Sequence, residues 1–131
     1  MIPDIRGWLA GMRVPVIEDV TDIRDVFVIL LPAAGASVAA VGTGREAAEF
    51  LGGGEFDVIL TDLGLPDIPG DVLVRQISTA RARIRIVVIT GYGEPYLTQA
   101  RQAGARAVFT KPMEWNRVLD YLCSPDLAAS A

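Results

Sequence analysis

Residues 57–70 read DVILTDLGLPDIPG and join a short apolar run to an acid, then to a segment rich in glycine, leucine and proline. The continuous run Val58-Ile59-Leu60 is typical of a parallel strand that is buried on both faces. The glycines and prolines after it predict a loop. Asp62 therefore stands at the end of a buried strand, and the question is which residues elsewhere in the chain this carboxylate meets.

The same alternation of an apolar run and an amphipathic segment continues along the whole chain. The predicted strands cover residues 12–17, 37–41, 57–61, 84–90 and 107–110, and the predicted helices cover residues 22–34, 43–51, 70–79, 94–104 and 113–122. Thr21 or Asp22 is expected to cap the first helix, and Thr43 with Glu46 forms a capping-box pattern at the second. Alternating strands and helices predict an α/β fold with a doubly wound, five-stranded parallel sheet and helices on both faces.

The composition excludes several classes of protein. A chain of 131 residues, 51% of them hydrophobic, has the size of one domain and can bury a core. The chain has no histidine and a single cysteine, Cys123, so it has no serine–histidine or cysteine–histidine machinery and too few ligands for zinc. Any metal ion would be held by oxygen atoms, which favours magnesium, calcium or manganese.

Charge and hydropathy also bear on partners and location. The net charge of −4 provides no basic surface, so we expect no direct nucleic-acid binding. No apolar run approaches the ~18 residues of a membrane span, and the first residues do not have the pattern of a signal peptide. A single cysteine is compatible with a reducing compartment. We therefore expect a cytoplasmic protein without a membrane segment.

Polar residues gather at the carboxyl ends of the predicted strands. They are Glu18 and Asp19 after the first strand, Asp62 after the third, Thr90 at the end of the fourth and Lys111 after the fifth. In a parallel sheet these ends share one edge, where ligands bind. Carboxylates that lie close together repel one another, and a divalent cation relieves the repulsion. With one ammonium and one hydroxyl beside them, this edge is suited to an oxyanion that is added to a carboxylate.

Each of these residues has an ordinary explanation when it is taken alone. Asp62 can be a turn former, Thr90 a strand residue and Lys111 a solvated surface charge. A second functional hypothesis is a small nucleotide-binding, Rossmann-like domain, because Gly42 and Gly44 follow a strand and Asp62 ends the next one. That hypothesis leaves the acid pair, the threonine and the lysine without a role.

Four segments together resemble the receiver domain of two-component response regulators, the CheY-like family. They are VIED at 16–19, DVILTDLGLPDIPG at 57–70, VVITGYGE at 87–94 and AVFTKP at 107–112. The resemblance covers about residues 13–122, and it implies a flavodoxin-like strand order of 2-1-3-4-5. The intact set of five polar residues disfavours a degenerate receiver that only binds a partner.

The resemblance also implies a role for each residue of the set. Asp62 would be the phosphoacceptor. Asp19, Asp62 and the backbone carbonyl of Gly64 would ligate Mg²⁺ directly, with Glu18 acting largely through water and Mn²⁺ as a substitute ion. Thr90 and Lys111 would contact the phosphoryl group. The peptide bond before Pro112 is expected to be cis.

The expected partner is a histidine kinase or a histidine phosphotransfer protein. A receiver catalyses its own phosphorylation and dephosphorylation without being a turnover enzyme. The face formed by the fourth helix, the fifth strand and the last helix is expected to bind a second copy or a target protein. The chain would be either a stand-alone regulator or the receiver of a hybrid sensor histidine kinase.

The predicted domain covers residues 12–122, with an N-terminal tail or linker over 1–11 and a C-terminal tail over 123–131. Two features depart from the family pattern. The family's switch aromatic usually stands where this chain has Val108, and Phe109 comes one place later, so its side chain is expected to face the helical layer as core. Pro15 removes one ladder donor from the first strand.

Overall fold

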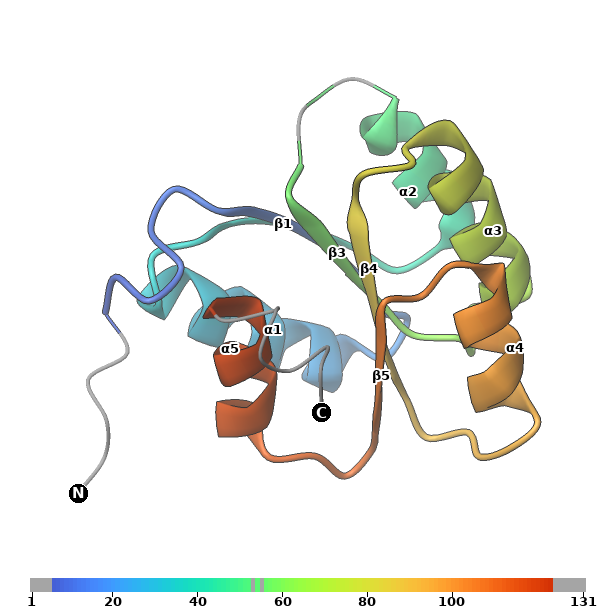
Figure 1. The fold of residues 1–131 in the computed structure, drawn as a ribbon. Helices are drawn as coiled ribbons and strands as arrows, with labels where there is room; N and C mark the ends of the chain where they lie inside the picture. The colour runs from blue at the N-terminus through green and yellow to red at the C-terminus, as the bar shows by residue number, and fades with distance from the viewer. Residues whose placement is uncertain (1–5, 53, 55, 124–131) are drawn as a thin grey trace.

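The computed structural model describes residues 6–52, 54 and 56–123, and strands and helices alternate throughout them (Figure 1). The strands are β1 (Arg13–Ile17), β2 (Ser37–Val41), β3 (Val58–Thr61), β4 (Arg85–Thr90) and β5 (Ala107–Thr110). The helices are α1 (Thr21–Ala33), α2 (Gly44–Leu51), α3 (Gly70–Ala80), α4 (Tyr96–Ala103) and α5 (Trp115–Cys123). Every predicted element is present, with its bounds displaced by at most two residues.

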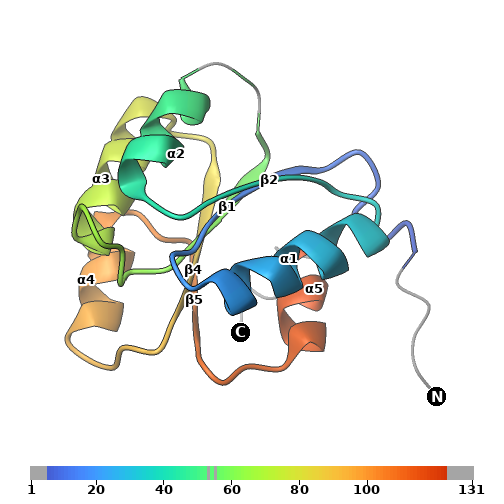
Figure 2. The ribbon, with the colours of Figure 1, turned by 180° about the vertical axis from the view of Figure 1, so that it is seen from behind.

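The strands form one parallel sheet in the order β2-β1-β3-β4-β5, which confirms the predicted topology. Helices α1 and α5 cover one face, and α2, α3 and α4 cover the other (Figures 1 and 2). Phe27 and Leu31 of α1 pack with Leu119 of α5 in one core cluster. Leu73 and Val74 of α3 belong to the cluster on the opposite face. No helix of the described residues is long and apolar enough to cross a membrane.

The position of Pro15 explains how a proline fits a central strand. Glu18 donates its N–H to Val41 of β2, whereas Ile17 accepts from Asp62 after β3. The backbone groups of alternate residues in a strand point toward opposite neighbouring strands, so Pro15, like Ile17, has its nitrogen on the β3 side. The β1–β3 pairing covers only the last two residues of β1, Val16 and Ile17. The missing donor therefore lies just outside the ladder.

Two local expectations differ from the structure. Leu9, which we expected in a tail, is 1% exposed and donates its N–H to Ala34 at 2.8 Å, so the turn of residues 6–11 contributes to the core. Helix α1 has no side-chain cap, because its N-cap residue is Val20, which has no acceptor in its side chain, and Thr21 is already the first helical residue. The domain limits of 12 and 122 remain a prediction, and residues 1–5 and 124–131 lie outside the described part.

Candidate functional site

The carboxyl edge of the sheet brings the predicted lysine and acids together. Lys111 Nζ lies 2.6 Å from Glu18 Oε1 and 3.1 Å from Asp62 Oδ2. Glu18 and Asp62 directly follow β1 and β3, which are adjacent in the sheet, and Lys111 follows β5. One ammonium therefore bonds two carboxylates that belong to different strands.

Asp62 is held firmly at the end of β3. The residue is 9% exposed, and its Oδ1 accepts the Leu63 N–H at 2.7 Å and the Gly64 N–H at 3.4 Å. Burial raises the pKa of Asp62, but the hydrogen bond and charge of Lys111 and the Leu63 N–H outweigh it. The pKa of Asp62 therefore lies below its ordinary value, and the side chain is an anion at neutral pH.

Glu18 is the most deeply buried of the acids, with 2% exposure. Burial raises its pKa to about 7, and the negative charge of Asp62 adds to this, while the hydrogen bond from Lys111 opposes it. Burial alone would lower the pKa of Lys111, but its hydrogen bonds to Glu18 and Asp62 outweigh burial and raise it. The ammonium thus stays charged between the two acids.

Asp19 completes a set of oxygen ligands. Its carboxylate is exposed, and carboxylate oxygens of Glu18, Asp19 and Asp62 lie within 4.8 Å of one another. Three carboxylates exceed the single ammonium of Lys111 in charge, so the cluster keeps room for more positive charge. Hard oxygen donors of this kind fit Mg²⁺ and not a zinc ion.

Gly64 lies on the loop that follows Asp62, and Thr90 is the last residue of β4. Thr90 is 0% exposed, and its Oγ1 accepts the Tyr92 N–H at 3.1 Å. Gly64 forms an isolated bridge with Pro69, which closes the loop that follows Asp62. A Cβ at position 64 would lie 2.9 Å from Tyr92 Oη, so the glycine allows the two loops to approach.

The chain after β5 has the predicted backbone. The Lys111–Pro112 peptide is cis, which confirms the expectation from the resemblance. The N–H of Lys111 donates to the Thr90 carbonyl at 2.8 Å, so the threonine and the lysine lie at adjacent strand ends.

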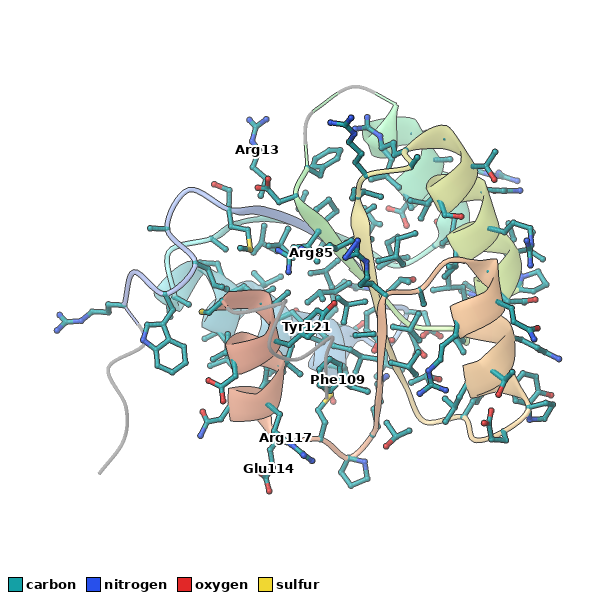
Figure 3. The ribbon with its side chains drawn as sticks, in the orientation of Figure 1. Arg13, Arg85, Phe109, Glu114, Arg117 and Tyr121 are labelled. Atoms are coloured by element: carbon teal, nitrogen blue, oxygen red, sulfur yellow. The ribbon has the colours of Figure 1, made fainter. Side chains whose placement is uncertain are left out.

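Val108 and Phe109 face opposite sides of the sheet, as expected. Val108 packs against the cluster that includes Ala100 and Ala103 of α4. Phe109 points toward α5, where its ring meets the ring of Tyr121 edge-on at 5.9 Å (Figure 3). Phe109 thus faces the helical layer as predicted, but it is half-buried and packs against the core cluster, so it is not one of the buried core residues.

Sequence reasoning missed Asp67. Its carboxylate accepts the Gly44 N–H at 2.9 Å and the Arg45 N–H at 2.8 Å, at the start of α2. Those hydrogen bonds hold the pKa of Asp67 below its usual value. One half of the predicted capping box forms, because the Glu46 N–H donates to Thr43 Oγ1 at 3.1 Å, but the Glu46 carboxylate accepts the Gly42 N–H at 3.4 Å in place of the Thr43 N–H. The donors that a nucleotide phosphate would need at this glycine motif are thus already bonded, which argues against the Rossmann-like alternative.

Residues 14–122 match the family model described as the response regulator receiver domain. The chain belongs to this family. It is 32% identical over 117 residues to the response regulator PilR of Pseudomonas aeruginosa, and the match covers 88% of this chain and 26% of PilR. It is 28% identical over 114 residues to the chemotaxis protein CheY of Thermotoga maritima, covering 86% of this chain and 95% of CheY.

Solved structures have the same fold. A CheY-like receiver from Methanospirillum hungatei superposes with a TM-score of 0.84 at 24% identity, covering 91% of this chain and 96% of that one. A response regulator from Burkholderia pseudomallei gives a TM-score of 0.79 at 26% identity, with 92% and 74% coverage. The receiver domain spans about a quarter of PilR but nearly all of CheY.

Membership of the family places this receiver domain in two-component signal transduction. Its family takes part in phosphotransfer with histidine kinases or phosphotransfer proteins and binds Mg²⁺ at an acidic cluster. In this chain the cluster is formed by Glu18, Asp19 and Asp62.

Proposed function

We propose that the receiver domain accepts a phosphoryl group on Asp62 from a phosphohistidine of a histidine kinase or a histidine phosphotransfer protein. The observation that carries the proposal is the double contact of Lys111 with Glu18 and Asp62 at the carboxyl edge of the sheet. The arrangement supplies an ionised carboxylate, a fixed ammonium and an acidic cluster in one place.

The transfer exchanges one bond to phosphorus for another. An Asp62 oxygen attacks phosphorus in line, the phosphorus–nitrogen bond breaks, and its electron pair leaves with the imidazole. Lys111, released from Asp62 Oδ2, then bonds an oxygen of the new phosphoryl group. The Thr90 hydroxyl donates to a second oxygen. The product is an acyl phosphate, which water hydrolyses to restore Asp62.

The acidic cluster would hold Mg²⁺, with Mn²⁺ as a substitute. Asp19, Asp62 and the Gly64 carbonyl are the proposed direct ligands, and Glu18 acts through water, because its carboxylate is 2% exposed and already bonded to Lys111. When bound, the ion supplies positive charge for the phosphoryl oxygens. The Burkholderia pseudomallei regulator, at 26% identity, was solved with a phosphorylated aspartic acid, a calcium ion and citrate, which supports both phosphorylation of an aspartate and binding of a divalent cation.

The partner surfaces belong to the same proposal. The face formed by α4, β5 and α5 would bind a second copy or a target protein, and the phosphodonor would reach Asp62 from the carboxyl edge. The proposed location is the cytoplasm. The chemistry is the same whether the receiver acts alone or within a hybrid histidine kinase.

Replacement of Asp62 by asparagine tests the proposal. The amide is close to isosteric and is a poor nucleophile, so Asp62→Asn should gain no phosphoryl mass from acetyl phosphate and Mg²⁺ in mass spectrometry. Asp57→Asn, at the other end of β3, is the control and should be labelled like the unmodified protein. A labelled Asp62→Asn variant would place the phosphoacceptor elsewhere.

A further inference from the structure

The loop after Asp62 is bonded to the start of α2 through Asp67. Gly44 and Arg45 donate their N–H groups to the Asp67 carboxylate across 23 and 22 positions of the chain. The first N–H groups of a helix have no partner within the helix. Here a remote side chain bonds two of them, and its negative charge lies at the positive end of the helix dipole.

Packing between α2 and this loop is equally tight. A Cβ at position 44 would lie 2.2 Å from Ile68 Cγ2, so any larger residue there would force the Ile68 side chain to move. The loop is also closed at its base, where Gly64 pairs with Pro69 and the Gly70 N–H donates to Leu63 at 3.0 Å. Asp67 and Gly64 therefore belong to one short loop that is closed by hydrogen bonds, so a shift of Asp67 should also move Gly64.

Residues 42–45, at the start of α2, also contact the loop that carries Glu18 and Asp19. Arg24 Nη1 donates to the Glu18 carbonyl at 2.8 Å. A Cβ at position 42 would lie 2.7 Å from the same nitrogen, so the Arg24 guanidinium packs directly on Gly42. Residues 42–45 thus contact both acid-bearing loops, one through Arg24 and the other through Asp67.

We propose that residues 42–45 act as a brace which sets the separation between the Glu18–Asp19 loop and the Asp62–Gly64 loop. Asp67 is then a positioning residue for the metal site, although it contacts neither the metal ligands nor the phosphoryl group. The inference rests on the proposed function, since it concerns the Mg²⁺ affinity of that site. It also gives a structural role to the Gly42-x-Gly44 motif, which the phosphotransfer chemistry does not use.

The change in Mg²⁺ affinity is measured by titrating Mg²⁺ and monitoring the amide NMR signal of Gly64. Asp67→Ala removes both acceptors and should weaken Mg²⁺ binding about tenfold. Asp67→Asn keeps one carbonyl acceptor and should recover part of the affinity. Asp71→Asn is the matched control, because it removes the same charge from the first turn of α3, where Asp71 has no hydrogen bond to the described residues. It should bind Mg²⁺ like the unmodified protein.

Hydrogen exchange without Mg²⁺ provides a second readout. The amides of Gly44, Arg45 and Gly64 should exchange faster in Asp67→Ala, while circular dichroism confirms that the variant is folded. If that variant does not fold, Asp67→Asn and Arg24→Gln provide the test, and both should bind Mg²⁺ more weakly. Unchanged affinity in the folded Asp67 variants, or an equal loss in Asp71→Asn, would overturn the brace alone. Absence of Mg²⁺ binding in the unmodified protein would overturn the metal site as well.

Discussion

Lys111 Nζ lies 2.6 Å from Glu18 Oε1, although 93 positions separate the two residues in the chain. The same ammonium also bonds Asp62 Oδ2 at 3.1 Å. Lys111 therefore supplies the positive charge that two largely buried acids share.

Replacement of Lys111 by methionine should lower both phosphotransfer and stability. Phosphorylation by acetyl phosphate should slow by about 100-fold, because one donor to the transferring oxygens is lost. The free energy of unfolding at pH 8 should fall by about 1–3 kcal/mol, since Glu18 and Asp62 lose a buried partner. Stopped-flow kinetics and urea unfolding measure the two effects. An unchanged rate would remove Lys111 from the chemistry.

The pKa of Glu18 makes both stability and metal binding depend on pH. The folded pKa of about 7 exceeds the ordinary 4.5, so the proton on Glu18 stabilises the fold below pH 4.5, and this contribution is lost as the pH rises from 4.5 to 7. Because Mg²⁺ competes with that proton, its affinity should rise by up to about tenfold per unit below pH 7. Calorimetry at several pH values tests this, and Glu18→Gln should flatten the profile. A flat profile in the unmodified protein would contradict the prediction.

Asp19→Ala should weaken Mg²⁺ binding by about tenfold or more, and more strongly than Glu18→Ala does. Asp19 is exposed and free to ligate the ion, whereas the Glu18 carboxylate is already bonded to Lys111. NMR titration of both variants under the same conditions gives the comparison. Equal losses would show that the two acids do not differ in their roles.

Phosphorylation should move the loop of residues 91–95 and the start of α4. Thr90 now accepts the Tyr92 N–H, and a bond from its hydroxyl to a phosphoryl oxygen would disturb this contact. Addition of beryllium fluoride and Mg²⁺ should therefore shift the amide signals of residues 91–96, and Thr90→Ala should reduce the shifts. Large shifts at Val108 and Phe109 with a static loop would place the switch in β5 instead.

Gly70→Ala should destabilise the fold, although alanine favours helices. A Cβ at position 70 would lie 2.2 Å from the Leu63 Cα, and overpacking of this kind costs about 1–3 kcal/mol. Gly91→Ala is the control, because nothing lies within 4 Å of a Cβ there. Urea unfolding measures the free energy of unfolding of both variants. Equal values would mean that the loop after Asp62 shifts at little cost to accommodate the added Cβ.

The sequence predicted each strand and helix to within two residues, because burial and secondary structure impose local periods on the side chains. It failed at the start of α1 and in the turn of residues 6–11. Thr21 and Asp22 look like caps for α1 but make no capping hydrogen bond. Leu9 looks like a tail residue but is buried, because it packs in the core cluster with Phe27 and Leu31 of α1.

The sequence alone determined that Glu18, Asp19, Asp62, Thr90 and Lys111 gather at one edge, since parallel strands all end on the same side of their sheet. Only the tertiary structure decided how these groups pair and how strongly burial raises the pKa of Glu18. It also decided that Asp67 bonds the start of α2. Such contacts join residues that are far apart in the chain. The sequence does not show which of many backbone donors will lie next to a given carboxylate, because the packing of the whole fold determines this.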